Sequence, residues 1–218
     1  RDRSVSRGLG DVYKRQKKTS DIRLLDKKEQ LCLEEYVSKI HNSTTLGITL
    51  AMTTGIRIGE LCALQWKDID LEKRILTVSK TVQRIQLHEA DRKTKLIITE
   101  PKSESSKRII PIPEAVVAFL KEMRENDEDF VVSGTSRVIE PRTMQYRFAK
   151  ILKNVNLPSV HFHALRHMFA SNCIRLGFDI KALSEILGHS SVEITLNRYV
   201  HSSFEQKTEY MNRITICV

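Results

Sequence analysis

The sequence is 218 residues long, 40% hydrophobic and 29% charged, with a formal net charge of +9 at pH 7. This balance is typical of a globular protein and excludes collagen-like and low-complexity chains, while no apolar run approaches the roughly 18 residues of a membrane-spanning helix. The four cysteines include no CxxC pair, which excludes a zinc ribbon and suits a reducing compartment, so we expect a soluble cytoplasmic protein without membrane contact.

The first 16 residues differ in character from the rest of the chain. Residues 1–16 show no apolar periodicity and resemble translated adaptor sequence, so we interpret them as non-native and exclude them from the fold. The alternative is a disordered basic arm. Because the first methionine is Met52, we also expect that the natural protein contains sequence that precedes this chain.

Helical patterns cover the chain from residue 25 to residue 64. A helix over 25–40 is expected to start with a capping box, in which Asp26 is the cap and Glu29 follows three residues later. The apolar run over 44–54 predicts a buried helix that Gly55 ends, and a short helix is expected over 57–64.

A small antiparallel sheet is expected next. Alternation predicts strands at 75–79 and 82–85, and strands at 96–99 and 107–111 flank the polar turn PKSESSK and are expected to pair as a hairpin. Residues 73–110 contain ten Lys or Arg against four Asp or Glu, a net charge of +6. This local excess indicates a polyanionic partner or, alternatively, a solubilising face. The DNA contacts that we expect are Lys93, Lys95, Lys107 and Arg108.

The second half of the chain reads as helical. Helices are expected at 114–125, 141–154, 163–177, 180–187 and 192–199, with a short strand at 129–133 and a last segment at 203–211. Gly177 and Gly188 stand where helices end. The sequence therefore predicts one α+β domain, mostly helical, with a small antiparallel sheet or hairpin in its first half.

Two places in the first half carry side chains suited to chemistry. Arg57 follows a glycine in apolar surroundings, where a charge needs a partner. An ion pair with Glu60, three residues later on the same helix face, would supply one. Lys102 lies in the polar turn of the expected hairpin, where the ordinary interpretation is a solvated surface lysine.

Two further places lie near the end of the chain. His163, Arg166 and His167 are spaced i, i+3 and i+4, so their side chains share one helix face. We expect no metal there, because the Glu of an HExxH motif and a third ligand are both absent. His189 precedes Tyr199 by ten residues, and the alternative for Tyr199 is a half-buried core residue.

Together these residue types suit phosphodiester chemistry without a metal. A tyrosine attacks phosphorus once its proton is removed. Two arginines neutralise the charge that develops on the phosphate oxygens, as a metal does elsewhere. A lysine can protonate the leaving 5′ oxygen. No cofactor is expected, because a phosphotyrosine keeps the energy of the broken bond for rejoining.

The motifs TGIRIGEL, TEPKSESSKRIIPI, HALRH, LGHSS and RYVH, in this order, resemble those of the tyrosine recombinases, also called phage integrases. The resemblance covers residues 25–211, the catalytic domain of that family, and leaves 212–218 as a tail. It implies that the scissile phosphate is held by Arg57, Arg166 and His189. It further implies His163 as general base, Lys102 as general acid and Tyr199 as nucleophile, with Glu60 and His167 as supporting residues.

The same resemblance implies double-stranded DNA as substrate, a homotetramer on synapsed sites and a nucleoid-associated enzyme of a mobile element. It also implies that residues 17–24 are a linker from an N-terminal core-binding domain that is missing here. Three alternatives stay open: a type IB topoisomerase with the same chemistry, a non-catalytic DNA-binding module, and a metal-dependent nuclease, which EDTA would inhibit.

Overall fold

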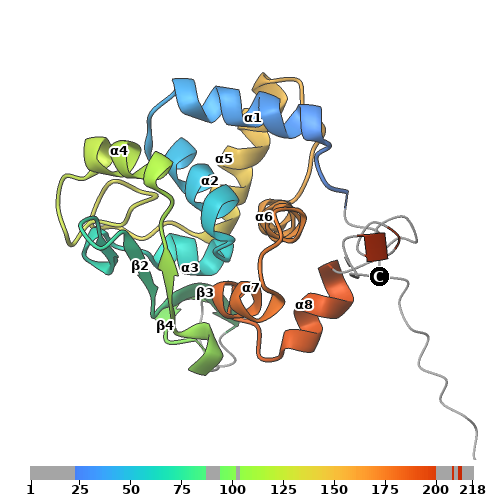
Figure 1. Cartoon of the computed structure of the whole chain (residues 1–218). Helices are drawn as coiled ribbons and strands as arrows, with labels where there is room; N and C mark the ends of the chain where they lie inside the picture. Colours follow the sequence, from blue (N-terminus) through green and yellow to red (C-terminus); the bar gives the residue numbers. More distant parts are fainter. Residues whose placement is uncertain (1–22, 87–93, 102–103, 200–207, 209–210, 213–218) are drawn as a thin grey trace, which may run out of the picture.

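The computed structural model describes residues 23–86, 94–101, 104–199, 208 and 211–212 of the chain. Helices predominate in this part (Figure 1), namely α1 (Lys27–Lys39), α2 (Ser43–Thr54), α3 (Ile58–Ala63), α4 (Glu114–Met123), α5 (Pro141–Asn154), α6 (His163–Arg175), α7 (Ile180–Leu187) and α8 (Val192–Tyr199). The expected α+β fold with its small sheets in the first half is confirmed. Every helix in the described part of the chain is too short or too polar to cross a membrane.

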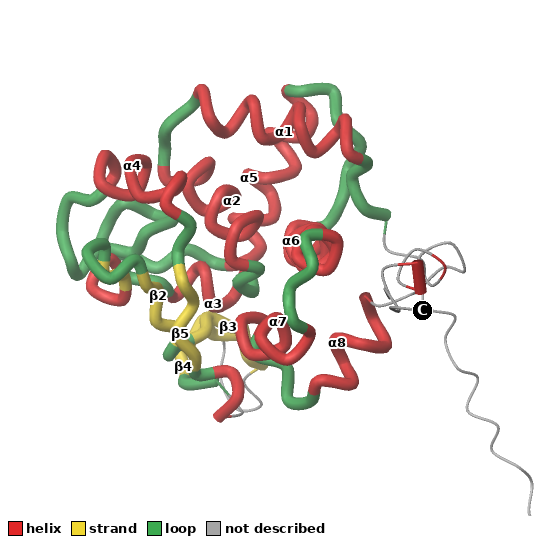
Figure 2. The backbone as a smooth tube through the Cα atoms, viewed as in Figure 1, coloured by secondary structure: helices red, strands yellow, loops and turns green. Residues whose placement is uncertain are grey.

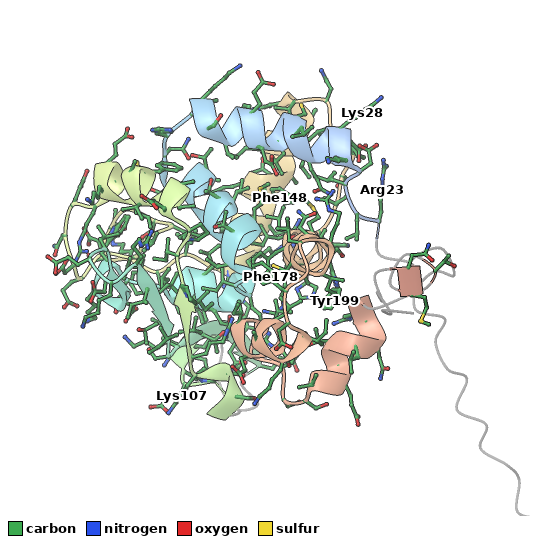
Figure 3. All side chains as sticks on the ribbon, in the orientation of Figure 1. Arg23, Lys28, Lys107, Phe148, Phe178 and Tyr199 are labelled. Atoms are coloured by element: carbon green, nitrogen blue, oxygen red, sulfur yellow. The ribbon has the colours of Figure 1, made fainter. Side chains whose placement is uncertain are left out.

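Helix α2 lies at the centre of the domain and contacts α1, α3, α4, α5 and α6. Seven of its twelve residues are buried and it has no charged side chain, which is expected of a helix surrounded by others. Asn42 caps its first turn by accepting hydrogen bonds from the Thr44 and Thr45 amides. Phe148 of α5 points into the same core (Figure 3), where its ring packs edge-on against Phe162 at 5.4 Å between centroids.

The strands form two antiparallel sheets on the side of the domain next to α3 and α7 (Figure 2). One sheet has the order β1 (Ile69–Asp70), β2 (Ile75–Val78) and β5 (Arg108–Pro111), and the other pairs β3 (Thr81–Gln86) with β4 (Thr94–Thr99). The expected hairpin of 96–99 with 107–111 is therefore wrong. Strand β5 pairs with β2 instead, because this register sets the buried Leu76 beside the buried Ile110.

The expected strand at 129–133 is also wrong. The chain there forms tight turns with isolated bridges from Phe130 to Gln65 and to Thr135. It reverses at Gly134, whose φ of 65° is in the left-handed region that glycine tolerates. The apolar pattern at this position reflects burial of Val131 and Val132 in the core and not pairing in a sheet.

A second, smaller apolar cluster holds helices α6, α7 and α8 together. It contains Phe169, Ala170 and Cys173 of α6 with Leu183 and Leu187 of α7, and Tyr199 of α8 packs against it. The boundaries expected for α5, α7 and α8 agree with the structure, and α6 ends two residues early. The expected segment at 203–211 lies mostly outside the described residues.

Candidate active site

The turn between α2 and α3 places the first arginine of the site. Gly55 ends α2 at φ 64°, and a Cβ atom there would lie 2.5 Å from Phe169 and 2.9 Å from Leu187. Glycine is therefore required by both the backbone conformation and the packing. Arg57 follows as the N-cap of α3, and its amide donates to Glu60 Oε2 at 3.0 Å. This bond fixes the direction in which the Arg57 side chain leaves the backbone.

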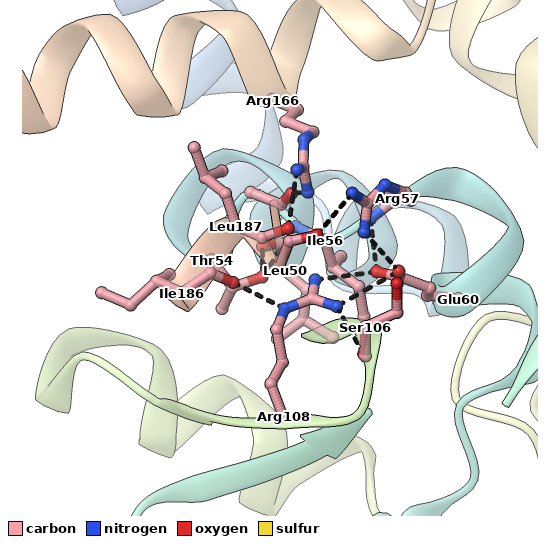
Figure 4. A network of polar contacts seen from close by, with 12 residues as sticks. Leu50, Thr54, Ile56, Arg57, Glu60, Ser106, Arg108, Arg166, Ile186 and Leu187 are labelled. Carbon is pink, nitrogen blue, oxygen red and sulfur yellow. Dashed lines mark hydrogen bonds and ion pairs between the residues drawn. The ribbon is translucent and has the colours of Figure 1, made fainter. Parts of the chain in front are cut away.

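Glu60 lies between two guanidinium groups (Figure 4). Its carboxylate accepts hydrogen bonds from Arg57 Nη1 at 2.8 Å and from Arg108 Nη2 at 2.8 Å, and its side chain is only 3% exposed. Burial by itself raises the pKa of Glu60, but Arg108 and Arg57 outweigh it and hold the pKa below its ordinary value. The expected Arg57–Glu60 ion pair is present, and it orients Arg57 without occupying all of its donors.

Arg108 was expected to contact DNA from the surface, and the structure places it elsewhere. Its side chain is 6% exposed, and its guanidinium is turned inward onto Glu60. Lys107, the residue before it, is 40% exposed and forms an ion pair with Glu100 at 2.7 Å between Nζ and Oε2. Lys95 is exposed on β4, whereas Lys93 and Lys102 lie outside the described residues.

Arg166 is buried in the first half of α6. It donates from Nη1 to the Gly55 carbonyl at 2.8 Å and from Nη2 to the Leu187 carbonyl at 2.6 Å. Burial, together with repulsion from Arg57 and Arg108, lowers the pKa of Arg166 to about 9. Within the described part of the chain its partners are carbonyl groups and not a carboxylate. A buried cation held in this way is a ready site for an anion.

A cavity of about 270 Å³ opens at this point of the molecule. Its walls contain cationic, imidazole and small polar groups, contributed by Arg57, Ser106, His163, Arg166, Gly188, His189, Ser190, Ile194 and Arg198. No acidic side chain is among these lining residues. In the described residues, no group of three His, Cys, Asp or Glu could hold a metal ion. The cavity is therefore suited to a phosphate or another polyanionic group.

The two histidines of the cavity are held in the neutral form. Burial and the neighbouring His167 and Arg166 lower the pKa of His163 to about 4. Burial and the charges of Arg166 and Arg57 lower the pKa of His189 to about 4. His189 Nδ1 lies 2.8 Å from the hydroxyl of the buried Thr195, so its Nε2 is left for a ligand. A neutral imidazole at neutral pH can accept a proton.

Tyr199 stands at the end of α8 (Figure 3). It is not among the residues that line the cavity, but Arg198, the residue before it, is. Its ring is near His189 and His167, with centroid distances of 6.4 and 5.5 Å. The hydroxyl is buried and has no hydrogen-bond partner among the described residues. Burial raises the pKa of Tyr199, and the charges of Arg166 and Arg198 oppose that rise. Tyr199 is thus packed as a half-buried core residue, as the alternative in the sequence analysis expected.

His167 lies one helical turn after His163, and its ring is near those of His163 and Tyr199. The two histidine rings meet edge-on at 4.8 Å between centroids, and His167 Nε2 is buried without a hydrogen-bond partner within the described ranges. Burial and the charges of Arg198 and Arg166 lower its pKa. The sequence reasoning missed Arg198 as a cavity residue, although its position directly before the tyrosine in RYVH was a usable signal.

The chain is similar to known proteins in sequence and in fold. The chain matches the family model "Phage integrase family" over residues 23–206. It is 34% identical to a XerC-like tyrosine recombinase of Caldanaerobacter subterraneus subsp. tengcongensis, over 73% of this chain and 46% of the relative. It is 28% identical to the transposase from transposon Tn916 of Enterococcus faecalis, over 87% of this chain and 50% of the relative.

A solved structure of the Tn1549 transposon integrase in complex with transposon right-end DNA has the same fold. The TM-score is 0.71 at 26% identity, over 91% of this chain and 67% of that chain. The chain spans about half the length of the curated relatives it matches. The family match covers most of the chain, and the chain belongs to the phage integrase family.

Proposed function

We propose that this chain is the catalytic part of a site-specific recombinase that cuts and rejoins double-stranded DNA through a 3′-phosphotyrosine. The observation that carries the proposal is the cavity itself, in which three arginines and two neutral histidines, with no acidic side chain among the lining residues, lie next to a tyrosine. Arginine charge at the phosphate supplies the stabilisation that a metal gives elsewhere.

The chemical step assigns each group one role. The Tyr199 oxygen bonds to phosphorus while the bond to the 5′ oxygen breaks. The phenolic proton passes to His163, and the 5′ oxygen receives a proton from Lys102. Arg57, Arg166 and His189 hold the non-bridging oxygens. The charge of Arg166, which lines the cavity, acts on the Tyr199 hydroxyl and favours loss of its proton during the attack.

The reverse step gives recombination. A 5′ hydroxyl from a second DNA strand attacks the phosphotyrosine and releases Tyr199, so the reaction needs no cofactor. We propose a homotetramer on two synapsed sites, acting at the nucleoid for the integration or excision of a mobile element. Relatives that are named as transposases of Tn916 and Tn1545, and as the integrase of ICEBs1, support the mobile element.

A covalent capture experiment tests the proposal without knowledge of the DNA site. The chain is incubated in EDTA with nicked duplexes whose core sequence is randomised. Because of the nick, cleavage releases a short strand that diffuses away and cannot be rejoined. The expected result is a protein–DNA adduct that survives denaturant and is attached through the 3′ end of the cut strand. Attachment through a 5′ end, or cleavage that requires added metal, would overturn the proposal. In a separate assay the chain is incubated with a supercoiled plasmid. Relaxation of the plasmid without recombinant products would favour the topoisomerase alternative.

A further inference from the structure

Three successive carbonyl groups at the end of α7 each accept a hydrogen bond from a different arginine (Figure 4). The bonds measure 2.6, 2.6 and 2.8 Å and are formed by Arg108 Nε with Ile186 O, Arg166 Nη2 with Leu187 O, and Arg57 Nη2 with Gly188 O. The last carbonyls of a helix have no partner within the helix and carry the negative end of its dipole. Cationic side chains from α6, β5 and the start of α3 satisfy them here.

Arg108 differs from the other two arginines in what it faces. Arg57 and Arg166 line the cavity, whereas Arg108 does not. Its remaining donors are directed to the Glu60 carboxylate at 2.8 and 3.2 Å and to the Ser106 carbonyl at 3.0 Å. With these bonds made, Arg108 has little left to offer a phosphate. It connects the carboxylate that orients Arg57 to the helix end that precedes His189.

The close approach of Arg108 to the helix end depends on a glycine. Gly188 has φ 63°, and a Cβ atom at this position would lie 3.0 Å from Cδ and Nη1 of Arg108. A side chain there would crowd the Arg108 side chain, which would have to shift slightly, and would strain the left-handed backbone of the turn. The absence of a side chain at Gly188 thus leaves room for Arg108 beside the turn.

We propose that Arg108 is a positioning residue of the active site, which joins Glu60 to the end of α7 so that Arg57 and His189 face the same phosphate. The proposal rests on the proposed function, in which these two residues bind the scissile phosphate. A lysine cannot take the place of Arg108, because a single ammonium group cannot bond to both carboxylate oxygens and the Ile186 carbonyl in this fixed geometry. The fork of the guanidinium is needed, and not its charge alone.

The contact of Arg108 with both Glu60 and the end of α7 is called the brace below. Hydrogen exchange of this chain without DNA tests the brace directly. The Gly188 and His189 amides donate to the Glu185 and Ser184 carbonyls at 3.0 and 3.1 Å, so their exchange reports on the turn. In Arg108→Lys we expect exchange of both amides to rise about tenfold, because bonds to a charged group are lost. The matched control is Arg124→Gln, which removes an arginine bonded to Asp127 and to a backbone carbonyl far from the cavity. It should leave both amides unchanged.

Cleavage kinetics supply the second measurement. On the duplex that the parent protein captures, Arg108→Lys should slow adduct formation about tenfold or more while DNA affinity stays within about twofold. A melting temperature close to that of Arg124→Gln shows that the variant is folded. Parental cleavage and parental exchange in Arg108→Lys would overturn the brace, since charge alone would then suffice. If the parent forms no adduct, the proposed function fails, and the exchange result still decides the role of Arg108.

Discussion

The ring of Tyr199 lies parallel to the ring of His189, with an interplanar angle of 6° and 6.4 Å between centroids. This stacking joins the last residue of α8 to the turn that ends α7. The hydroxyl of Tyr199 is buried, and the charge of Arg166, a residue that lines the cavity, acts on it. The contact therefore holds the tyrosine that we propose as nucleophile beside the residues that line the cavity.

Protonation of the two cavity histidines should destabilise the fold. Their pKa values of about 4 lie below the ordinary 6.5, so the unfolded chain binds more protons than the folded chain between these pH values. The free energy of unfolding is expected to decrease as the pH falls from about 6.5 to about 4. Urea unfolding at several pH values measures this. His163→Gln and His189→Gln should each flatten the dependence, and an unchanged slope in both variants would contradict it.

Removal of the Glu60 carboxylate should destabilise the domain strongly. Glu60→Gln leaves the buried guanidinium of Arg108 and the half-buried one of Arg57 without a counter-charge. Loss of one partner from such a buried group costs about 3 kcal/mol. Denaturant unfolding provides the value. As a control, Glu128→Gln breaks an exposed ion pair with Lys67 and should change stability by less than about 1 kcal/mol. Equal effects of the two substitutions would refute the network.

Arg166→Ala should slow cleavage about a hundredfold without abolishing DNA binding. Arg166 is the most deeply buried cation of the cavity, and removal of one such donor to the transition state costs on the order of 3 kcal/mol, or about a hundredfold in rate. Single-turnover adduct formation under saturating protein measures the rate, and a gel-shift titration measures the affinity. A parental cleavage rate in this variant would remove Arg166 from the mechanism.

The basic segment should set the salt dependence of DNA binding. Replacement of Lys93 and Lys95 by Ala is expected to reduce the slope of log affinity against log salt by about 2, close to 0.9 for each phosphate contact. Lys95 is exposed on β4, consistent with such a contact. Lys121→Ala on α4 serves as the control for a lost surface charge. If the slope of the double variant equals that of the parent, this segment faces solvent in the complex.

The sequence predicted the helices better than the sheets. Capping residues such as Asp26 and breakers such as Gly55 and Gly188 are local signals, so helix ends could be located from them. Strand partners are set by distant packing, and for this reason β5 was assigned to β4 although it pairs with β2. A polar turn between two strands was therefore not sufficient to establish that they pair.

In the candidate site, too, local motifs could be predicted from the sequence, whereas contacts between distant residues could not. The expected residues Arg57, His163, Arg166 and His189 do line one cavity. They could be predicted because each lies in a motif with a recognisable sequence pattern. The inward turn of Arg108 was not predicted, since a basic residue in a basic segment looks like a surface contact until its partner is known. That partner, Glu60, is 48 residues away in the chain.

The central claim is that Tyr199 forms the covalent bond to DNA, and one substitution tests it most directly. Tyr199→Phe removes a hydroxyl that has no hydrogen-bond partner among the described residues, so folding and DNA affinity should be retained. On the nicked duplex captured by the parent, in EDTA, the parent should accumulate a denaturant-resistant adduct and Tyr199→Phe should accumulate none. An adduct that still forms with Tyr199→Phe at the parental rate would show that another residue is the nucleophile.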